Sequence, residues 1–344
     1  MIDLLVAGGG PAGLATAIHA ARAGLDVVVA EPRPGPVDKA CGEGLMPGAV
    51  PALERLGVTP RGFPLHGIDY RDGRRSAQHR FVTGNALGVR RTTLHAALLA
   101  RADELGVDFL TDRVDGVEQD ARRARLRTAA GREIAADWVL AADGLHSTLA
   151  RLTGLHRPTP RARRRYGLRK HFVVEPWSDL IEVHWTPLGE LYVTPTADGM
   201  VGLALLTRRR VAFDDALAAS PELAGRVRGA PVATELRGAG PLRQNTRART
   251  AGRVLLVGDA SGYVDALTGE GIRIGIAQAR AAVAAVVRDR ADEYERTWTE
   301  VTKDVRRLTG ALVRLAESPA RGLVVPVSHA APGIFASAVE RLAR

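Results

Sequence analysis

The sequence of 344 residues predicts an α/β fold with two sheets, one Rossmann-like and parallel, the other mainly antiparallel, followed by C-terminal helices. Two glycine-rich strand–turn–helix patterns, one near each end of the chain, predict the parallel sheet. Short alternating strands between them, with turns at Asp72-Gly73, Leu188-Gly189 and Asp198-Gly199, predict the antiparallel sheet. A chain of this length is expected to form roughly two domains.

The first pattern lies at the N-terminal end. The apolar run Leu4–Ala7 is followed by Gly8-x-Gly10-x-x-Gly13 and an alanine-rich helical stretch to about Ala23. Gly8 suits the tight turn, Gly10 lets the backbone approach a pyrophosphate, and Gly13 lets helix and strand pack closely. The phosphates would therefore meet the helix N-terminus.

An acidic residue completes this pattern. The apolar run Val27–Ala30 ends at Glu31, about twenty residues beyond the glycines, where an acid hydrogen-bonds an adenosine ribose. The motif alone leaves NAD, NADP and FAD as alternative cofactors. A glycine-rich turn that binds no ligand can also contain this motif.

The second pattern favours FAD. A buried strand is expected at Arg253–Val257, ending at Gly258-Asp259, where a carboxylate can accept hydrogen bonds from a ribityl chain. Gly269 and Gly271 then open a helix whose free N–H groups would face the electron-rich edge of a flavin ring.

A third motif lies between these two. Trp138–Ala142 is expected to form a strand, and Asp143-Gly144 a turn before a short helix. With these three motifs in this order, the chain from Met1 to about Ala285 resembles FAD-dependent oxidoreductases of the p-hydroxybenzoate hydroxylase type, the group A flavin monooxygenase superfamily. The segments CGEGLMP (Cys41–Pro47) and GDASGYVDALTGEGI resemble its geranylgeranyl reductase-like branch most.

The resemblance implies roles for particular residues. Glu31 and the glycines would hold the ADP half of FAD, Asp259 the ribityl and pyrophosphate part, and Thr268–Ile272 would run under the isoalloxazine. Arg91, with Arg90 as the alternative, matches an arginine near the flavin. The residues expected to bind the cofactor are Gly8, Gly10, Pro11, Ala12, Gly13, Glu31, Pro32, Arg33, Cys41, Gly42, Arg91, Asp143, Gly258, Asp259, Gly269, Gly271 and Ile272.

The chain also departs from the family pattern. Ala150 stands where family members commonly have arginine, with Arg151 one position later, and Ala266 replaces a common proline. The segment Leu191–Gly199, which resembles the floor of the substrate cavity, lacks the aromatic residues common there. The Trp-x-Trp-x-Ile-Pro signature of flavin halogenases is missing, so halogenation is not expected.

Composition limits the possible partners. The formal charge is +10, but only three lysines occur, and the arginine runs Arg161–Arg165 and Arg208–Arg210 accompany no RNA-binding motif or zinc finger. We therefore expect no nucleic acid partner, and solvated basic faces or weak contact with an anionic membrane surface or acidic carrier protein. The sequence gives no indication of oligomeric state.

The sequence also indicates the cellular location. No apolar run is long enough for a membrane span, and no basic leader precedes the first strand, so we expect a cytoplasmic protein. Cys41 is the only cysteine, which excludes an internal disulfide, and the histidines lack metal-ligand spacing.

The expected domains are discontinuous. Helices are expected at Ile272–Val287 and Asp292–Leu315, and Pro319 and Pro326 are expected to break the helical pattern beyond them. The C-terminal segment that remains is expected to cap the substrate opening. The expected ranges are 1–65, 85–155 and 249–318 for the FAD domain, 66–84 and 156–248 for the substrate sheet, and 319–344 for the cap.

Few side chains are candidates for chemistry, because flavin itself carries the redox reaction. Cys41 is expected beside the isoalloxazine, where a cysteine assists protonation in some reductases of the branch. His184, Tyr192 and His171 are candidate polar groups of the cavity, whereas His146 is expected in a surface turn.

Three functions fit this sequence. The first is a monooxygenase that hydroxylates or epoxidises a hydrophobic phenolic or olefinic substrate with O2, favoured because the floor segment lacks aromatic residues. The second is a flavin-dependent reductase of isoprenoid or polyketide double bonds. The third is a non-catalytic flavin-binding module. NADPH or NADH would visit only transiently as the donor, because the chain contains no second nucleotide-binding pattern.

Overall fold

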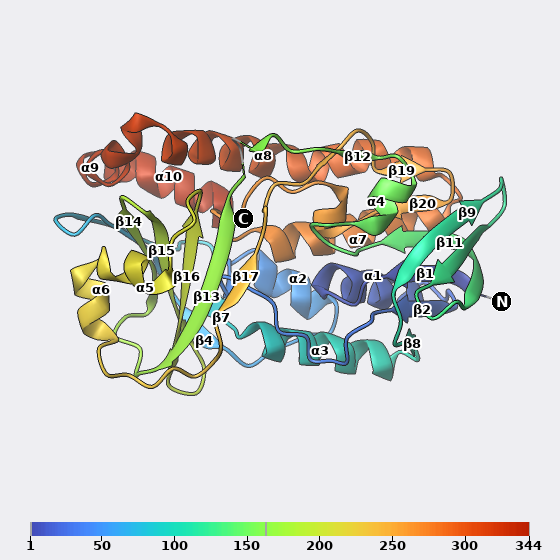
Figure 1. Cartoon of the computed structure of the whole chain (residues 1–344), viewed down its shortest axis with the longest axis horizontal. Helices are drawn as coiled ribbons and strands as arrows, with labels where there is room; N and C mark the ends of the chain where they lie inside the picture. Colours follow the sequence, from blue (N-terminus) through green and yellow to red (C-terminus); the bar gives the residue numbers. More distant parts are fainter. Residues whose placement is uncertain (1, 162–163, 344) are drawn as a thin grey trace.

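The computed structural model describes residues 2–161 and 164–343. The middle of the basic run Arg161–Arg165 therefore lies outside the described residues. Two sheets stand at opposite ends of an elongated molecule, and a long helix runs along one side (Figure 1). This arrangement confirms the predicted mixed α/β fold.

The first sheet has the strand order β19-β20-β11-β1-β2-β8, and β1 pairs in parallel with both β11 and β2. An antiparallel pair, β9 and β10, extends from β11. Its strands are β1 (Ile2–Ala7), β2 (Val27–Ala30), β8 (Asp108–Leu110), β9 (Val114–Gln119), β10 (Ala124–Thr128), β11 (Glu133–Ala141), β19 (Thr250–Ala251) and β20 (Val254–Leu256).

Both faces of this sheet are covered. On one face Leu4 and Val6 pack in a large apolar core with α1 (Pro11–Arg22), α3 (Arg91–Glu104) and α7 (Gly271–Val287). On the other face Leu5 and Ala7 pack with β9, β10 and α4 (Thr148–Leu152). Strands buried on both sides are continuous apolar runs, as this sequence has at Leu4–Ala7 of β1 and throughout β2.

The second sheet has the order β17-β13-β16-β15-β14-β5-β6 and is antiparallel except between β14 and β5. One face packs on α5 (Phe213–Ala218) and α6 (Pro221–Arg226), which lie beside it in Figure 1, and the other faces the first domain. Its strands are β5 (Gly67–Arg71), β6 (Ser76–Arg80), β13 (Tyr166–Val173), β14 (Leu180–Thr186), β15 (Gly189–Thr196), β16 (Met200–Thr207) and β17 (Arg237–Ala239).

Short elements join the two sheets. They are β3 (Gly44–Leu45), α2 (Ala49–Arg55), β4 (Phe63–Leu65), β7 (Ala86–Gly88), β12 (His156–Arg157), β18 (Asn245–Thr246) and η2 (Gly258–Ser261). The three strands β3, β7 and β4 form a small sheet of their own.

The C-terminal part consists of α8 (Ala291–Glu317), η3 (Pro319–Leu323), α9 (Val324–Ala330) and α10 (Pro332–Ala343). Pro319 ends the long helix, as expected. The expected break at Pro326 is wrong, because this residue lies in the first turn of α9, where a missing N–H removes no helical hydrogen bond. Over the described ranges no single helix is long and apolar enough to cross a membrane, although 319–330 and 332–343, bent by 104°, pass that test together.

Candidate active site

A cavity of about 630 Å³ lies between the two sheets. It begins at the carboxyl ends of β1 and β2, where open α/β sheets bind ligands, and extends over one face of the second sheet. All the residues expected to bind the cofactor line it except Gly13, which lies behind the turn. Lys39 and Arg113 also line it, although no sequence motif indicated either residue.

The glycine turn has the backbone that a pyrophosphate needs. Gly8 has a φ of 107°, and a Cβ on Gly13 would lie 1.8 Å from the Gly8 carbonyl oxygen, so α1 can pack this closely only with glycine there. A Cβ on Gly10 would meet only Arg91 Nη2, at 4.0 Å. Gly10 is also the N-cap of α1 without a capping side chain, so open space adjoins free helix N–H groups.

Glu31 closes this end of the cavity. Its Oε2 accepts a hydrogen bond from the Gly9 N–H at 2.9 Å, and its Oε1 accepts one from Arg33 Nε at 2.7 Å. Burial raises the pKa of Glu31, but the hydrogen bonds from Arg33 and from the Gly9 N–H, together with the Arg33 charge, lower it by more. The net pKa lies below the usual value, so the carboxylate is ionised and can accept a hydrogen bond from a ribose hydroxyl.

Two buried polar atoms in the wall have no partner among the described residues. They are Nη1 of Arg91, whose residue is 6% exposed, and Oδ1 of Asp143. Asp143 Oδ2 accepts from the N–H groups of Thr148 and Leu149, which holds its free oxygen in place. Buried donors and acceptors are normally paired, so these atoms indicate a polar ligand. Together with the space at Gly10, they fit a dinucleotide with phosphates and hydroxyls.

Asp259 lies at the start of η2, in the cavity wall. Burial raises the pKa of its carboxyl, against the charges of Lys39 and Arg91, which lower it. We expect the Asp259→Ala variant to lose about 1.5 to 3 kcal/mol of FAD binding, since a charged group that hydrogen-bonds a hydroxyl contributes about that much. Calorimetric titration of the apoprotein with FAD checks this, with Asp289→Ala, at an exposed position just beyond the end of α7, as the control. An unchanged affinity would place Asp259 outside the cofactor site.

The loop 39–46 crosses the cavity between the two sheets. Thr194 Oγ1 on β15 donates to the Gly42 carbonyl oxygen at 2.8 Å, which fixes the loop over the second sheet. Cys41 lies in the wall, and its Sγ accepts from the Glu43 N–H at 3.4 Å. Burial and the Glu43 charge raise the pKa of the thiol, although Arg91 and Arg169 act in the opposite direction. Cys41 is therefore a neutral thiol at neutral pH.

One face of the second sheet forms the floor of the cavity. Tyr70, Val183, Tyr192 and Ala204 stand opposite one another on β5, β14, β15 and β16, so their side chains point to the same face. All four line the cavity, with other apolar side chains. The Tyr192 hydroxyl donates to the Leu267 carbonyl oxygen at 2.9 Å, and burial raises its pKa well above the usual value. Tyr192 therefore joins the floor to the loop before α7.

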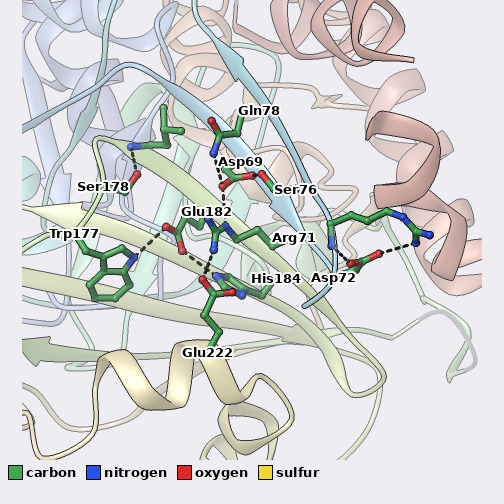
Figure 2. Close-up of polar contacts among 12 residues, drawn as sticks. Asp69, Arg71, Asp72, Ser76, Gln78, Trp177, Ser178, Glu182, His184 and Glu222 are labelled. Atoms are coloured by element: carbon green, nitrogen blue, oxygen red, sulfur yellow. Dashed lines mark hydrogen bonds and ion pairs between the residues drawn. The ribbon is translucent and has the colours of Figure 1, made fainter. Parts of the chain in front are cut away.

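His184 does not line the cavity, contrary to the sequence analysis. It is next to Val183 on β14, so its side chain points to the opposite face, beneath α5 and α6. There its Nε2 contacts Glu182 Oε2 at 2.9 Å and its Nδ1 contacts the Ser220 hydroxyl at 3.2 Å. Figure 2 shows Glu182 and His184 within a buried polar cluster that also contains Asp69 and Arg71.

His171 also lies outside the cavity wall. It is on the cavity-facing side of β13, opposite Gly202, but Glu43 covers it. The imidazole is fully buried and pairs with the Glu43 carboxylate through Nε2, and with the Thr234 hydroxyl through Nδ1 at 2.8 Å. Glu43 Oε1 in turn accepts from the Arg91 N–H at 2.8 Å. His171 therefore positions the loop and the start of α3.

The loop before α7 carries two buried acids that titrate near neutral pH. Burial raises the pKa of Glu270 to about 7, despite its ion pair with Arg273, and that of Asp265 to about 6. At these two positions the folded protein therefore holds protons that the unfolded chain releases, and the contribution of the two acids to the free energy of unfolding should fall as the pH rises from about 4 to about 7.

Glu270→Gln should remove part of this pH dependence, by at most about 3 kcal/mol. Urea unfolding of the apoprotein at about pH 5 and about pH 8 measures it. The exposed Glu300→Gln on α8 is the control. A Glu270→Gln variant whose stability falls between the two pH values as much as that of the parent would contradict the assignment.

This geometry defines a protein that holds a dinucleotide between a Rossmann-like sheet and an apolar second sheet. A family model described as the FAD binding domain matches residues 1–309, and the chain belongs to this family of FAD-binding proteins of the p-hydroxybenzoate hydroxylase type. The resemblance seen in the sequence is confirmed.

Several proteins of named function are similar to this chain. A menaquinone reductase of Mycolicibacterium smegmatis is 30% identical over 88% of this chain and 80% of its own length. Digeranylgeranylglycerophospholipid reductase 2 of Methanothermobacter thermautotrophicus is 30% identical over 79% of this chain and 74% of its own. Among solved structures, p-nitrophenol 4-monooxygenase PnpA of Pseudomonas putida has a TM-score of 0.82 at 19% identity, covering 100% of this chain and 96% of its own, which shows a shared fold.

Proposed function

We propose that this protein is an FAD-dependent reductase that saturates a carbon–carbon double bond in a long hydrophobic chain of isoprenoid type. The observation that carries the proposal is the continuous apolar floor beside a neutral thiol, Cys41. The two relatives described above are named as reductases of isoprenoid lipids or quinones, which supports the same substrate class. NADPH or NADH is proposed as the source of electrons.

The residues that would hold FAD are those of the polar end of the cavity. Gly8, Gly10 and the start of α1 would hold the pyrophosphate, Glu31 the adenosine ribose, and Asp259 the ribityl chain. When bound and reduced, FAD supplies a hydride equivalent.

The chain itself supplies three functions at the apolar end. The floor residues Tyr70, Val183 and Tyr192 bind a hydrophobic chain and exclude water. The loop held by Thr194 keeps Cys41 in the wall. The Cys41 thiol, kept neutral by burial, can donate the proton that the second carbon of the double bond requires.

Oxygenation is the second candidate, and its main support in the sequence was the lack of aromatic residues in Leu191–Gly199 other than Tyr192. In the structure, Tyr70 and Tyr263 from other segments supply aromatic side chains to the cavity. The cavity therefore contains aromatic side chains, so a lack of them no longer favours oxygenation over double-bond reduction. The enclosed apolar floor still suits oxygen transfer, which also needs a dry site.

Product analysis separates these functions. The purified holoprotein is supplied with NADPH and either a polyprenyl quinone or a geranylgeranyl lipid, under air and under argon. Saturation of a double bond at equal rates in both gases supports the reductase. An oxygenated product formed only under air would show a monooxygenase, and a bound flavin that NADPH and NADH fail to bleach would show a binding module.

A further inference from the structure

The segment η3–α9–α10 differs in composition from the rest of the chain. From Gly322 to Val339 it contains no Asp, Glu, Lys or Arg, although these make up 25% of all residues. Its inner face, with Val325, Phe335 and Val339, is buried against the second sheet. Its outer face is also apolar: Leu323 is 57% exposed, Val327 54% and Ile334 71%. We call Leu323, Val327 and Ile334 the outer face.

This segment adjoins the candidate active site. The Phe335 ring lies 5.0 Å from that of Tyr70 in the floor of the cavity, and Leu342 of α10 lines the cavity. Figure 1 shows α9 and α10 at the end of the molecule that holds the second sheet, far from the β9–β10 pair. The segment that carries the outer face therefore packs directly against the apolar floor.

The charges around the segment favour an anionic partner. Arg314 at the end of α8 and Arg341 near the end of α10 are exposed. The acidic groups close to them are already paired: Glu340 with His79 at 2.7 Å, and Glu317 with Arg208 at 3.6 Å. Apolar side chains that project beside exposed arginines are the pattern by which helices bind the interface of an anionic bilayer.

We propose that the outer face of η3–α9–α10 inserts into the interfacial region of an anionic membrane, with Arg314 and Arg341 contacting lipid headgroups. Binding of the membrane is independent of the reaction; delivery of a membrane-dissolved chain to the cavity beneath α10 rests on the proposed function. Two helices bent by 104° suit a position along the surface. This surface would let a chain that is insoluble in water enter the cavity without crossing solvent.

Vesicle flotation of the FAD-loaded full chain tests the proposal. We expect binding to phosphatidylglycerol–phosphatidylcholine vesicles and weaker binding to phosphatidylcholine alone. The triple variant L323S/V327S/I334S should bind the anionic vesicles at least about tenfold more weakly than the parent. The variant R314S/R341S should bind the anionic vesicles about fivefold to tenfold more weakly, with its binding to phosphatidylcholine vesicles unchanged. The control L152S/V232S/V287S removes exposed apolar side chains elsewhere and should bind like the parent.

The outcomes are separable from those of the proposed function. If the outer-face variant reduces a detergent-dissolved substrate like the parent but fails on a vesicle-embedded one, the delivery role holds. If the parent floats with vesicles but reduces neither substrate, the surface stands and the reductase proposal fails. A parent that does not float, an outer-face variant that floats equally, or a parent dimer that this variant dissociates in light scattering would overturn the membrane surface.

Discussion

The Gly13→Ala variant is expected to lose both its FAD and much of its stability. An alanine Cβ at this position would lie 1.8 Å from the Gly8 carbonyl oxygen and 3.3 Å from the Ala142 side chain. The first contact is with backbone, so α1 would have to move away from β1. That movement opens the core around Leu14 and displaces the phosphate turn, and we expect a cost of at least about 4 kcal/mol. Urea unfolding and the flavin absorbance of the purified protein measure the two effects.

Two other glycines serve as controls for this prediction. A Cβ on Gly10 meets no atom closer than 4.0 Å, so Gly10→Ala should fold normally and lose only affinity for FAD, since the methyl group enters the space for the phosphates. Gly225→Ala in α6 meets nothing within 4 Å and should change neither property. If Gly13→Ala were as stable and as yellow as the parent, the packing of α1 on the turn would be wrong.

The nucleotide end of the site could be predicted from the sequence because its requirements are local. Gly8, Gly10 and Gly13 lie within one short segment, and each is needed for a backbone reason that a single residue type satisfies. The Gly258-Asp259 turn follows its strand directly, in the same way. In the structure these separate turns line one cavity, because β1, β11 and β20 are parallel neighbours in the first sheet.

The substrate end could not be predicted in this way. Alternation along β14 shows that Val183 and His184 point to opposite faces, but both faces of this strand are buried, so burial does not say which face meets the cavity. The helices α5 and α6 cover the face of β14 that carries His184, which leaves the face of Val183 toward the cavity. Lys39 and Arg113 were missed for a related reason: they lie in loops whose course depends on the neighbouring sheet.

The Cys41→Ala variant is expected to keep FAD but lose the turnover of substrate. The thiol lies in the cavity wall with its pKa raised by burial and by Glu43, so it carries a proton that a methyl group cannot supply. Loss of a general acid typically lowers the rate by about 10²- to 10⁴-fold. Bleaching of the flavin by NADPH should remain at the parent rate, because that half of the reaction does not use the thiol.

Cys41→Ser is the matched variant, since it keeps the size of the side chain but places a much weaker acid in the wall. Its turnover should also fall, with FAD affinity unchanged.

Alkylation of Cys41 gives a readout that does not depend on turnover. Cys41 is the only cysteine of the chain, so every modified molecule reports this position. A half-buried thiol of raised pKa should react slowly near neutral pH, and more slowly still when FAD fills the cavity. An alanine variant that saturates double bonds at the parent rate would reduce Cys41 to a packing residue and leave the proton donor to another group of the wall.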